Sequence, residues 1–195
     1  MDQQAIIKEF EDAQAILRGH FILSSGLHSD TYLQCARVLM NASRAERLCN
    51  ALAKKIVNSL SNINFDIIVS PAMGGVIVGY EMGRQLNIPS VFCERANGVF
   101  ALRRGFNIPN NANVLIVEDV LTTGKSSKEA FTCVEENGGK VVAIASLIDR
   151  SNAPLNLEVP FISLLRIEAK TYAEETLPAH LKNMEATKPG SRNLA

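Results

Sequence analysis

The chain lacks net charge, long apolar runs and closely spaced cysteines. Lys plus Arg number 20 and so do Asp plus Glu, so the overall charge gives no attraction to nucleic acid or to a membrane surface. The hydrophobic content is 47%, yet no apolar run approaches the length that a membrane span requires. An anionic ligand would therefore have to be bound by local groups.

The cysteines and the first residues show no sign of a metal site or of export. Cys35, Cys49, Cys93 and Cys133 lie far apart, without a Cys-x-x-Cys pair, and no histidine stands at metal-ligand spacing. We expect buried, reduced thiols and neither disulfides nor a zinc site. The first ten residues, MDQQAIIKEF, lack the basic region and apolar core of a signal peptide, so a cytoplasmic location is expected.

Apolar spacing predicts alternating helices and strands within one α/β domain. Helices are predicted at 6–17, 43–60, after the glycines at 74–75 up to 86, and at 127–137. Strands are predicted at 66–70, 90–93, 114–117 and 141–148, with one more at 161–165. This alternation favours a twisted, mainly parallel sheet flanked by helices, with ligands at the carboxyl ends of the strands.

Local signals predict where these helices begin and end. Two capping boxes, Ser43 with Glu46 and Ser126 with Glu129, predict helix starts. Gly19 is interpreted as the stop of the first helix, and the glycines at 138–139 as the cap of the fourth. The tail at 188–195 is expected to be weakly ordered.

The segment at 114–126, VLIVEDVLTTGKS, is the most informative one. Its aliphatic run is typical of a strand buried on both faces of a parallel sheet. Glu118 and Asp119 follow this run, and buried carboxylates are costly unless they bind something. The hydroxyl-rich turn after them opens into a helix, whose free N–H groups and dipole favour phosphate. The two carboxylates could accept hydrogen bonds from neighbouring sugar hydroxyls or help to hold a divalent cation. The pattern indicates a phosphorylated sugar as ligand.

This segment has two other interpretations. Strand, turn and helix form the commonest unit of α/β proteins, so the turn could be an ordinary capped loop. Gly124-Lys125-Ser126 suggests a nucleotide P-loop, but that motif needs a glycine five residues before Gly124, where Asp119 stands. The P-loop interpretation therefore fails.

The same segment resembles the phosphoribosyl-pyrophosphate (PRPP) signature of type I phosphoribosyltransferases. Residues 21–39, FILSSGLHSDTYLQCARVL, look like the substrate-side segment of the orotate phosphoribosyltransferases. Residues 70–75, SPAMGG, resemble the pyrophosphate loop of the family, although a plain glycine turn is the alternative. Residues 94–106, ERANGVFALRRGF, resemble the mobile catalytic loop of one bacterial branch, the alternative being a solvated charge pair on a hairpin.

This resemblance implies transfer of the 5-phosphoribosyl group from PRPP to orotate in pyrimidine biosynthesis, with Mg²⁺ held mainly by the substrates. It implies catalytic roles for Asp119, Glu118, Arg104 and Arg103. The implied PRPP-binding residues are Glu118, Asp119, Val120, Leu121, Thr122, Thr123, Gly124, Lys125, Ser126 and Arg95. The implied pyrophosphate loop comprises Ser70, Pro71, Ala72, Met73 and Gly74. Orotate would be bound by Thr122, Arg150, Tyr32 and Leu33.

The resemblance further implies a homodimer in which the catalytic loop of one subunit serves the other subunit's site. It implies a single phosphoribosyltransferase domain, with residues of about 1–40 plus the C-terminal segment as a substrate-side hood over a PRPP-binding core of about 62–165. Two alternatives stay open: a purine phosphoribosyltransferase, and a catalytically silent regulator on the same fold. The regulator would normally add a basic DNA-binding segment, which this neutral chain lacks.

Overall fold

The computed structural model describes residues 1–23, 26–168 and 170–188. The predicted weakly ordered tail lies outside these residues from position 189 onward. Within the described residues no helix is both long and apolar enough to cross a lipid bilayer. All four cysteines are buried free thiols, as predicted.

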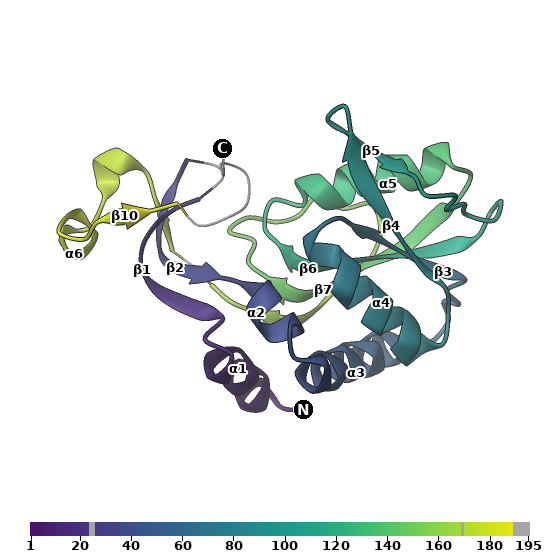
Figure 1. Ribbon diagram of the computed structural model, residues 1–195, viewed down its shortest axis with the longest axis horizontal. Helices are drawn as coiled ribbons and strands as arrows, with labels where there is room; N and C mark the ends of the chain where they lie inside the picture. The colour runs from purple at the N-terminus through teal and green to yellow at the C-terminus, as the bar shows by residue number, and fades with distance from the viewer. Residues whose placement is uncertain (24–25, 169, 189–195) are drawn as a thin grey trace.

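A six-stranded sheet, with helices on both faces, forms the larger part of the molecule (Figure 1). Its strands, in spatial order, are β5 (Val99–Leu102), β4 (Ser90–Ala96), β3 (Ile67–Pro71), β6 (Asn113–Leu121), β7 (Lys140–Asp149) and β8 (Phe161–Arg166). All neighbouring strands run parallel except β4 and β5. The predicted mainly parallel α/β sheet is therefore confirmed.

The helices divide between the two faces according to strand alternation. Helices α3 (Ala42–Ser59) and α4 (Gly74–Leu86) share a core with Ile68, Leu115 and Val117. Helix α5 (Lys125–Glu136) covers the other face, where Val69 and Ile116 point. Because successive residues of a strand face opposite sides, each central strand contributes to both cores.

Helix α4 packs against the sheet through a stripe of glycines spaced four residues apart. A Cβ at Gly79 would lie 2.0 Å from Ser70 Oγ, and one at Gly83 would lie 2.9 Å from Ile88 O. No larger side chain fits at these positions without displacing the strands. The stripe therefore sets the distance of α4 from β3 and β4.

A smaller four-stranded sheet lies beside the large sheet (Figure 1). Its strands, in spatial order, are β10 (Ala186–Thr187), β1 (Ile16–Ile22), β2 (His28–Leu33) and β9 (Thr171–Tyr172). The remaining helical elements are α1 (Gln3–Asp12), α2 (Cys35–Leu39), η1 (Glu174–Thr176) and α6 (Ala179–Lys182). The N-terminal and C-terminal segments thus meet in one sheet, although they are far apart in sequence.

The predicted helix at 6–17 is wrong at its C-terminal end. Helix α1 ends at Asp12, and Gln14 has a left-handed backbone with φ 50°. Ile16 and the following residues then pair with β2. The spacing of their apolar side chains fits a helix as well as a strand, and pairing with β2 makes this segment a strand. Gly19 accordingly lies within β1 and does not end a helix.

Both predicted capping boxes are wrong, whereas the glycine cap after α5 is confirmed. Asn41, not Ser43, caps α3, since its Oδ1 accepts a hydrogen bond from Arg44 N at 3.0 Å. Helix α5 begins at Lys125 after Gly124, which leaves Ser126 inside the first turn. At its other end Gly138 has φ 79°, and Gly139 N donates to Val134 O at 3.0 Å.

Candidate active site

The motif strand runs further than the sequence indicates. The predicted strand at 114–117 extends through both carboxylates to Leu121, and a three-residue turn, the phosphate turn (residues 122–124), leads into α5. Gly124 has φ 72°, and a Cβ there would lie 3.4 Å from Leu155 Cδ2. The first turn of α5 leaves N–H groups without intrahelical partners. Because such N–H groups favour a negatively charged ligand, the geometry is compatible with phosphate, and phosphate binding at this turn stays a prediction.

Glu118 is buried on the α5 side of the strand, with 7% of its surface exposed. Its Oε1 accepts a hydrogen bond from Ser127 Oγ at 2.7 Å. Burial raises the pKa of the Glu118 carboxyl group to about 7; the negative charge of Asp119 adds to this effect and the hydrogen bond from Ser127 opposes it. Glu118 is therefore a carboxyl group that changes charge near neutral pH.

Asp119 points to the other face of the sheet, against the start of α4. A Cβ on Gly74 would lie 2.7 Å from each of the two carboxylate oxygens of Asp119. Only glycine permits this approach. Burial also raises the pKa of Asp119, while backbone N–H groups of the strand lower it. The structure thus brings one of the two motif carboxylates into contact with the predicted pyrophosphate loop.

That loop (residues 70–74) joins the carboxyl end of β3 to α4. Ser70 and Pro71 end the strand and are buried, whereas Met73 is 83% exposed. The peptide bond between Ala72 and Met73 is cis. Ser70 Oγ is buried under Gly79 and has no hydrogen-bond partner within the described ranges of the chain. Apart from Met73, the loop thus carries small side chains at this edge of the sheet, and its role in binding pyrophosphate stays a prediction.

Arg150 follows β7 and lies on the same edge of the sheet. It is 7% exposed, and burial lowers the pKa of its guanidinium group. Tyr32 is its electrostatic neighbour; burial raises the pKa of the phenol, and the charge of Arg150 lowers it. Asp149 does not pair with Arg150: its carboxylate accepts from Ser151 N at 2.8 Å and lies 3.9 Å from Arg166 Nη1.

Within the described part of the chain, no carboxylate lies at ion-pair distance from Arg150. Neither Asp149 nor Glu168 therefore forms an ion pair with Arg150 in this part of the chain. A buried cation without a carboxylate is costly unless an anion reaches it. Leu33, by contrast, is 5% exposed and packs in the core, so its side chain does not share this space.

The segment at 94–106, here named the arginine hairpin, is formed by β4, β5 and the turn that follows them. Asn97 and Gly98 have φ 52° and 86°, which is typical of the tight turn of a β-hairpin. Arg95 pairs with Glu129 and lies over the ring of Phe100, its Cζ 4.3 Å from the ring centroid.

The two arginines that follow β5 share another partner. Arg104 donates to Glu94 Oε2 at 3.1 Å, and Arg103 Nη1 lies 3.9 Å from Glu94 Oε1. All three arginines of the hairpin thus have carboxylate partners within the chain.

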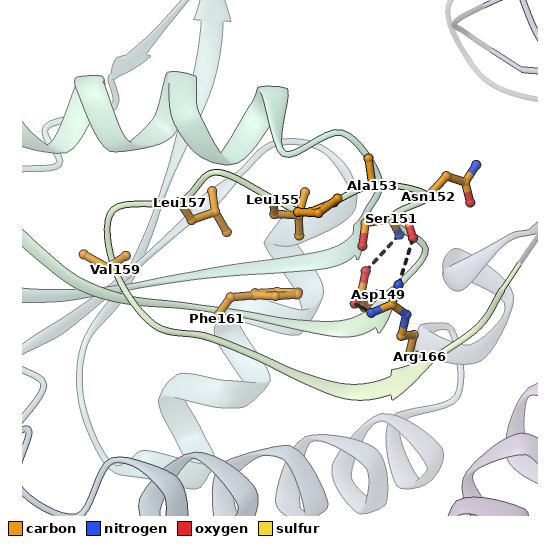
Figure 2. Close-up of a pocket in the computed structure, with 10 residues that line it drawn as sticks. Asp149, Ser151, Asn152, Ala153, Leu155, Leu157, Val159, Phe161 and Arg166 are labelled. Atoms are coloured by element: carbon orange, nitrogen blue, oxygen red, sulfur yellow. Dashed lines mark hydrogen bonds and ion pairs between the residues drawn. The ribbon is translucent and has the colours of Figure 1, made fainter.

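A cavity of about 530 Å³ lies beside the phosphate turn, under the loop that follows β7 (Figure 2). Apolar side chains line one end, and Asp149, Ser151 and Arg166 lie at the other. The lining residues are Asp149, Ser151, Asn152, Ala153, Pro154, Leu155, Leu157, Val159, Phe161 and Arg166. None of the predicted ligand-binding residues lines it. Leu155 and Leu157 separate it from Gly124.

Sequence reasoning missed two residues that contact the site residues. Ser127 donates to Glu118, and Glu94 pairs with Arg103 and Arg104. Glu94 stands next to Arg95 in a segment rich in charge, which is a weak signal. For Ser127 the signal was its position in the first turn of the helix after the motif.

Comparison with known proteins agrees with this geometry. The model of the family described as "Phosphoribosyl transferase domain" matches residues 39–182. The orotate phosphoribosyltransferase of Rhizorhabdus wittichii is 55% identical over 192 residues, which cover 98% of this chain and 97% of that protein.

Solved structures show the same fold at low identity. The orotate phosphoribosyltransferase from Aeropyrum pernix has a TM-score of 0.69 at 23% identity, covering 83% of this chain and 93% of that one. The UMP synthase of Leishmania donovani has a TM-score of 0.72 at 20% identity, covering 86% of this chain and 37% of that one. Together with the identity over nearly the full length, these findings show that the chain belongs to the orotate phosphoribosyltransferases of the type I phosphoribosyltransferase family.

Proposed function

We propose that the protein transfers the 5-phosphoribosyl group from PRPP to N1 of orotate, giving orotidine 5′-monophosphate and pyrophosphate in de novo pyrimidine biosynthesis. The observation that carries this proposal is the buried guanidinium of Arg150, which lies beside Tyr32 and has no carboxylate partner among the described residues. Orotate carries a carboxylate that a planar guanidinium can bind through two hydrogen bonds. Purine bases carry no such group.

PRPP is proposed to lie across the carboxyl ends of β3 and β6. The backbone N–H groups and hydroxyls of residues 121–126 would bind the 5′-phosphate at the start of α5. The pyrophosphate would lie on the loop at 70–74. Asp119 contacts that loop through Gly74, so its carboxylate would stand beside the bond that joins the ribose to the pyrophosphate.

Electrostatic stabilisation would account for most of the catalysis. As the bond at the anomeric carbon breaks, positive charge develops on the ribose, and a fixed carboxylate at Asp119 favours that charge. Negative charge develops on the leaving pyrophosphate, and Arg103 and Arg104 are proposed to meet it. Glu118 would bind ribose hydroxyls in its ionised form, since the carboxylate only accepts hydrogen bonds, whereas the protonated group donates from one oxygen. Thr122 would contact both ligands.

Mg²⁺ is proposed to enter mainly with the substrate. Among the described residues no three His, Cys, Asp or Glu side chains gather into a possible metal site. The oxygen atoms of Asp119, next to the pyrophosphate loop, are of the type that Mg²⁺ prefers. The ion, when bound, would neutralise charge on the pyrophosphate and orient it. A hood of residues 1–40 plus the C-terminal segment would cover this core at 62–165 and bring Tyr32 to the orotate.

A homodimer is proposed on the basis of an exposed apolar face on α4. Met73, Ile77 and Tyr80 are 83%, 50% and 72% exposed, and their spacing places them on one side of the helix. Large exposed apolar patches on soluble proteins mark interaction surfaces. Because Met73 belongs to the pyrophosphate loop, a second subunit at this face would lie next to the site, where its arginine hairpin could reach the pyrophosphate.

The test of the proposed reaction is release of pyrophosphate from PRPP in the presence of each candidate base. Orotate should support release, whereas hypoxanthine, adenine and uracil should not. A preference for a purine would overturn the assignment of orotate, and absence of turnover with every base would favour a silent regulator. A cytoplasmic location stays a prediction.

A further inference from the structure

The carboxylate of Glu94 pairs with both Arg103 and Arg104 at the end of the arginine hairpin. Arg104 Nη2 lies 3.1 Å from Glu94 Oε2, and Arg103 Nη1 lies 3.9 Å from Oε1. The arginine side chains are 60% and 59% exposed, whereas that of Glu94 is 20% exposed. The carboxylate is therefore the enclosed member of the group, and the two cations face solvent.

The pairing of Glu94 is incomplete. Its Oε1 is buried and has no hydrogen-bond partner among the residues that the structure describes. The separation of 3.9 Å from Arg103 is too long for a hydrogen bond, so only an electrostatic attraction remains. A buried, ionised oxygen that lacks a donor is unfavourable. The folded hairpin thus holds Arg103 and Arg104 through a contact that a better anion can replace.

The backbone holds Arg104 in place independently of Glu94. Phe106 N donates to Arg103 O at 3.0 Å, closing a turn in which Arg104 and Gly105 have φ 61° and 76°. The ring of Phe92 packs edge-on against Phe106, with centroids 5.1 Å apart, and lies 5.7 Å from Arg104 Cζ. Removing the carboxylate of Glu94 should therefore free the guanidinium group without unfolding the turn.

We propose that Glu94 is a positioning residue that competes with pyrophosphate for Arg103 and Arg104. This inference rests on the proposed function, in which these arginines meet the leaving group. Glu94 holds them when the site contains no pyrophosphate, and pyrophosphate, which carries more charge than a carboxylate, displaces it. After the reaction Glu94 rebinds the arginines and favours release of the product. The apparent affinity for pyrophosphate is lowered by the fraction of molecules in which the arginines are held.

The test is Glu94→Gln, which removes the charge and keeps the shape. Calorimetric titration with pyrophosphate in the presence of Mg²⁺ should give a dissociation constant about three- to tenfold lower than that of the unmodified protein. The Michaelis constant for PRPP should fall in the same direction, that for orotate should stay unchanged, and kcat should not rise. Glu135→Gln, on the exposed face of α5, is the control and should change none of these values.

A double-mutant cycle separates this inference from the proposed function. Arg104→Ala should weaken pyrophosphate binding, and Glu94→Gln in that background should tighten it much less than in the unmodified protein. If Arg104→Ala leaves the affinity unchanged, the proposed role of the arginine fails. If Arg104→Ala weakens pyrophosphate binding but Glu94→Gln does not tighten it, the inference about Glu94 fails while the proposed role of Arg104 stands. Glu94→Ala should act in the same direction as Glu94→Gln, so that the result does not depend on hydrogen bonds of the new amide.

Discussion

The buried carboxyl group of Glu118 should make the protein less stable as the pH rises. Burial raises its pKa from an ordinary value of 4.5 to about 7. The folded state therefore binds this proton more tightly than the unfolded state does. It follows that the stabilising contribution is complete below pH 4.5 and is lost as the pH rises through 7.

The size of this effect follows from the difference in pKa. At 1.36 kcal/mol per pKa unit, the shift corresponds to about 3 kcal/mol. Glu118→Gln stays neutral at every pH and keeps an oxygen that can accept from Ser127 Oγ. Compared with the unmodified protein, the variant should therefore have a free energy of unfolding that is higher by about 3 kcal/mol at pH 8.5 and nearly equal at pH 4.5.

Urea unfolding followed by circular dichroism, at a series of pH values, measures this difference. Glu135→Gln removes an exposed carboxylate from α5 and should give the same pH dependence as the unmodified protein. A difference between Glu118→Gln and the unmodified protein that does not change with pH would refute the argument, because it would mean that the carboxyl group titrates alike in both states.

The same titration should influence the substrate. If ribose hydroxyls bind the ionised form of Glu118, the Michaelis constant for PRPP should fall between pH 6 and pH 8 in the unmodified protein. In Glu118→Gln that constant should be higher and depend less on pH. The phosphates of PRPP titrate equally in both experiments, so the ratio of the two constants isolates the contribution of the protein. A constant ratio would contradict the proposed role.

Three further predictions test the site and the assembly. Asp119→Asn should lower turnover by about 10²-fold while PRPP still binds, and near-normal steady-state turnover would mean that this carboxylate does not face the developing charge. Arg150→Ala should raise the Michaelis constant for orotate by about ten- to a hundredfold with a small effect on that for PRPP, and Arg150→Lys should restore only part of it. Tyr80→Glu should shift the mass measured by light scattering from dimer to monomer, and an unchanged mass would place the interface elsewhere.

The carboxylates of the motif illustrate how far sequence reasoning reaches. The aliphatic run at 114–117 is long enough to predict a buried strand, and the strand is there. Its continuation through Glu118 and Asp119 could not be predicted, because two acidic residues disfavour a strand locally. What stabilises them there is contact with other elements: Ser127 on one face and the start of α4 on the other.

The arginine hairpin has a turn with a clear local signal and contacts that depend on strand pairing. The Asn97-Gly98 dipeptide is a strong local signal for a hairpin, and its backbone angles agree with that signal. The strand predicted at 90–93 nevertheless ends too early, because β4 continues to Ala96. Residues 94–96 belong to the strand because they pair with β5, which runs back alongside them. The attachment of Arg103 and Arg104 to Glu94 depends on that pairing, which brings residues ten positions apart into contact.

The sequence by itself determined the fold class and the family. The spacing of apolar residues encodes strands and helices locally, and the motif at 114–126 together with the segment at 21–39 distinguishes an orotate phosphoribosyltransferase from its relatives. The tertiary structure alone decided which groups meet. Residues from Ile16 onward pair with β2 and form a strand, although their apolar spacing also fits a helix. Burial raises the pKa of Glu118 to about 7. The arrangement of the elements leaves buried Arg150 without a carboxylate partner among the described residues. Burial and long-range contact depend on the whole chain, so no local pattern can specify them.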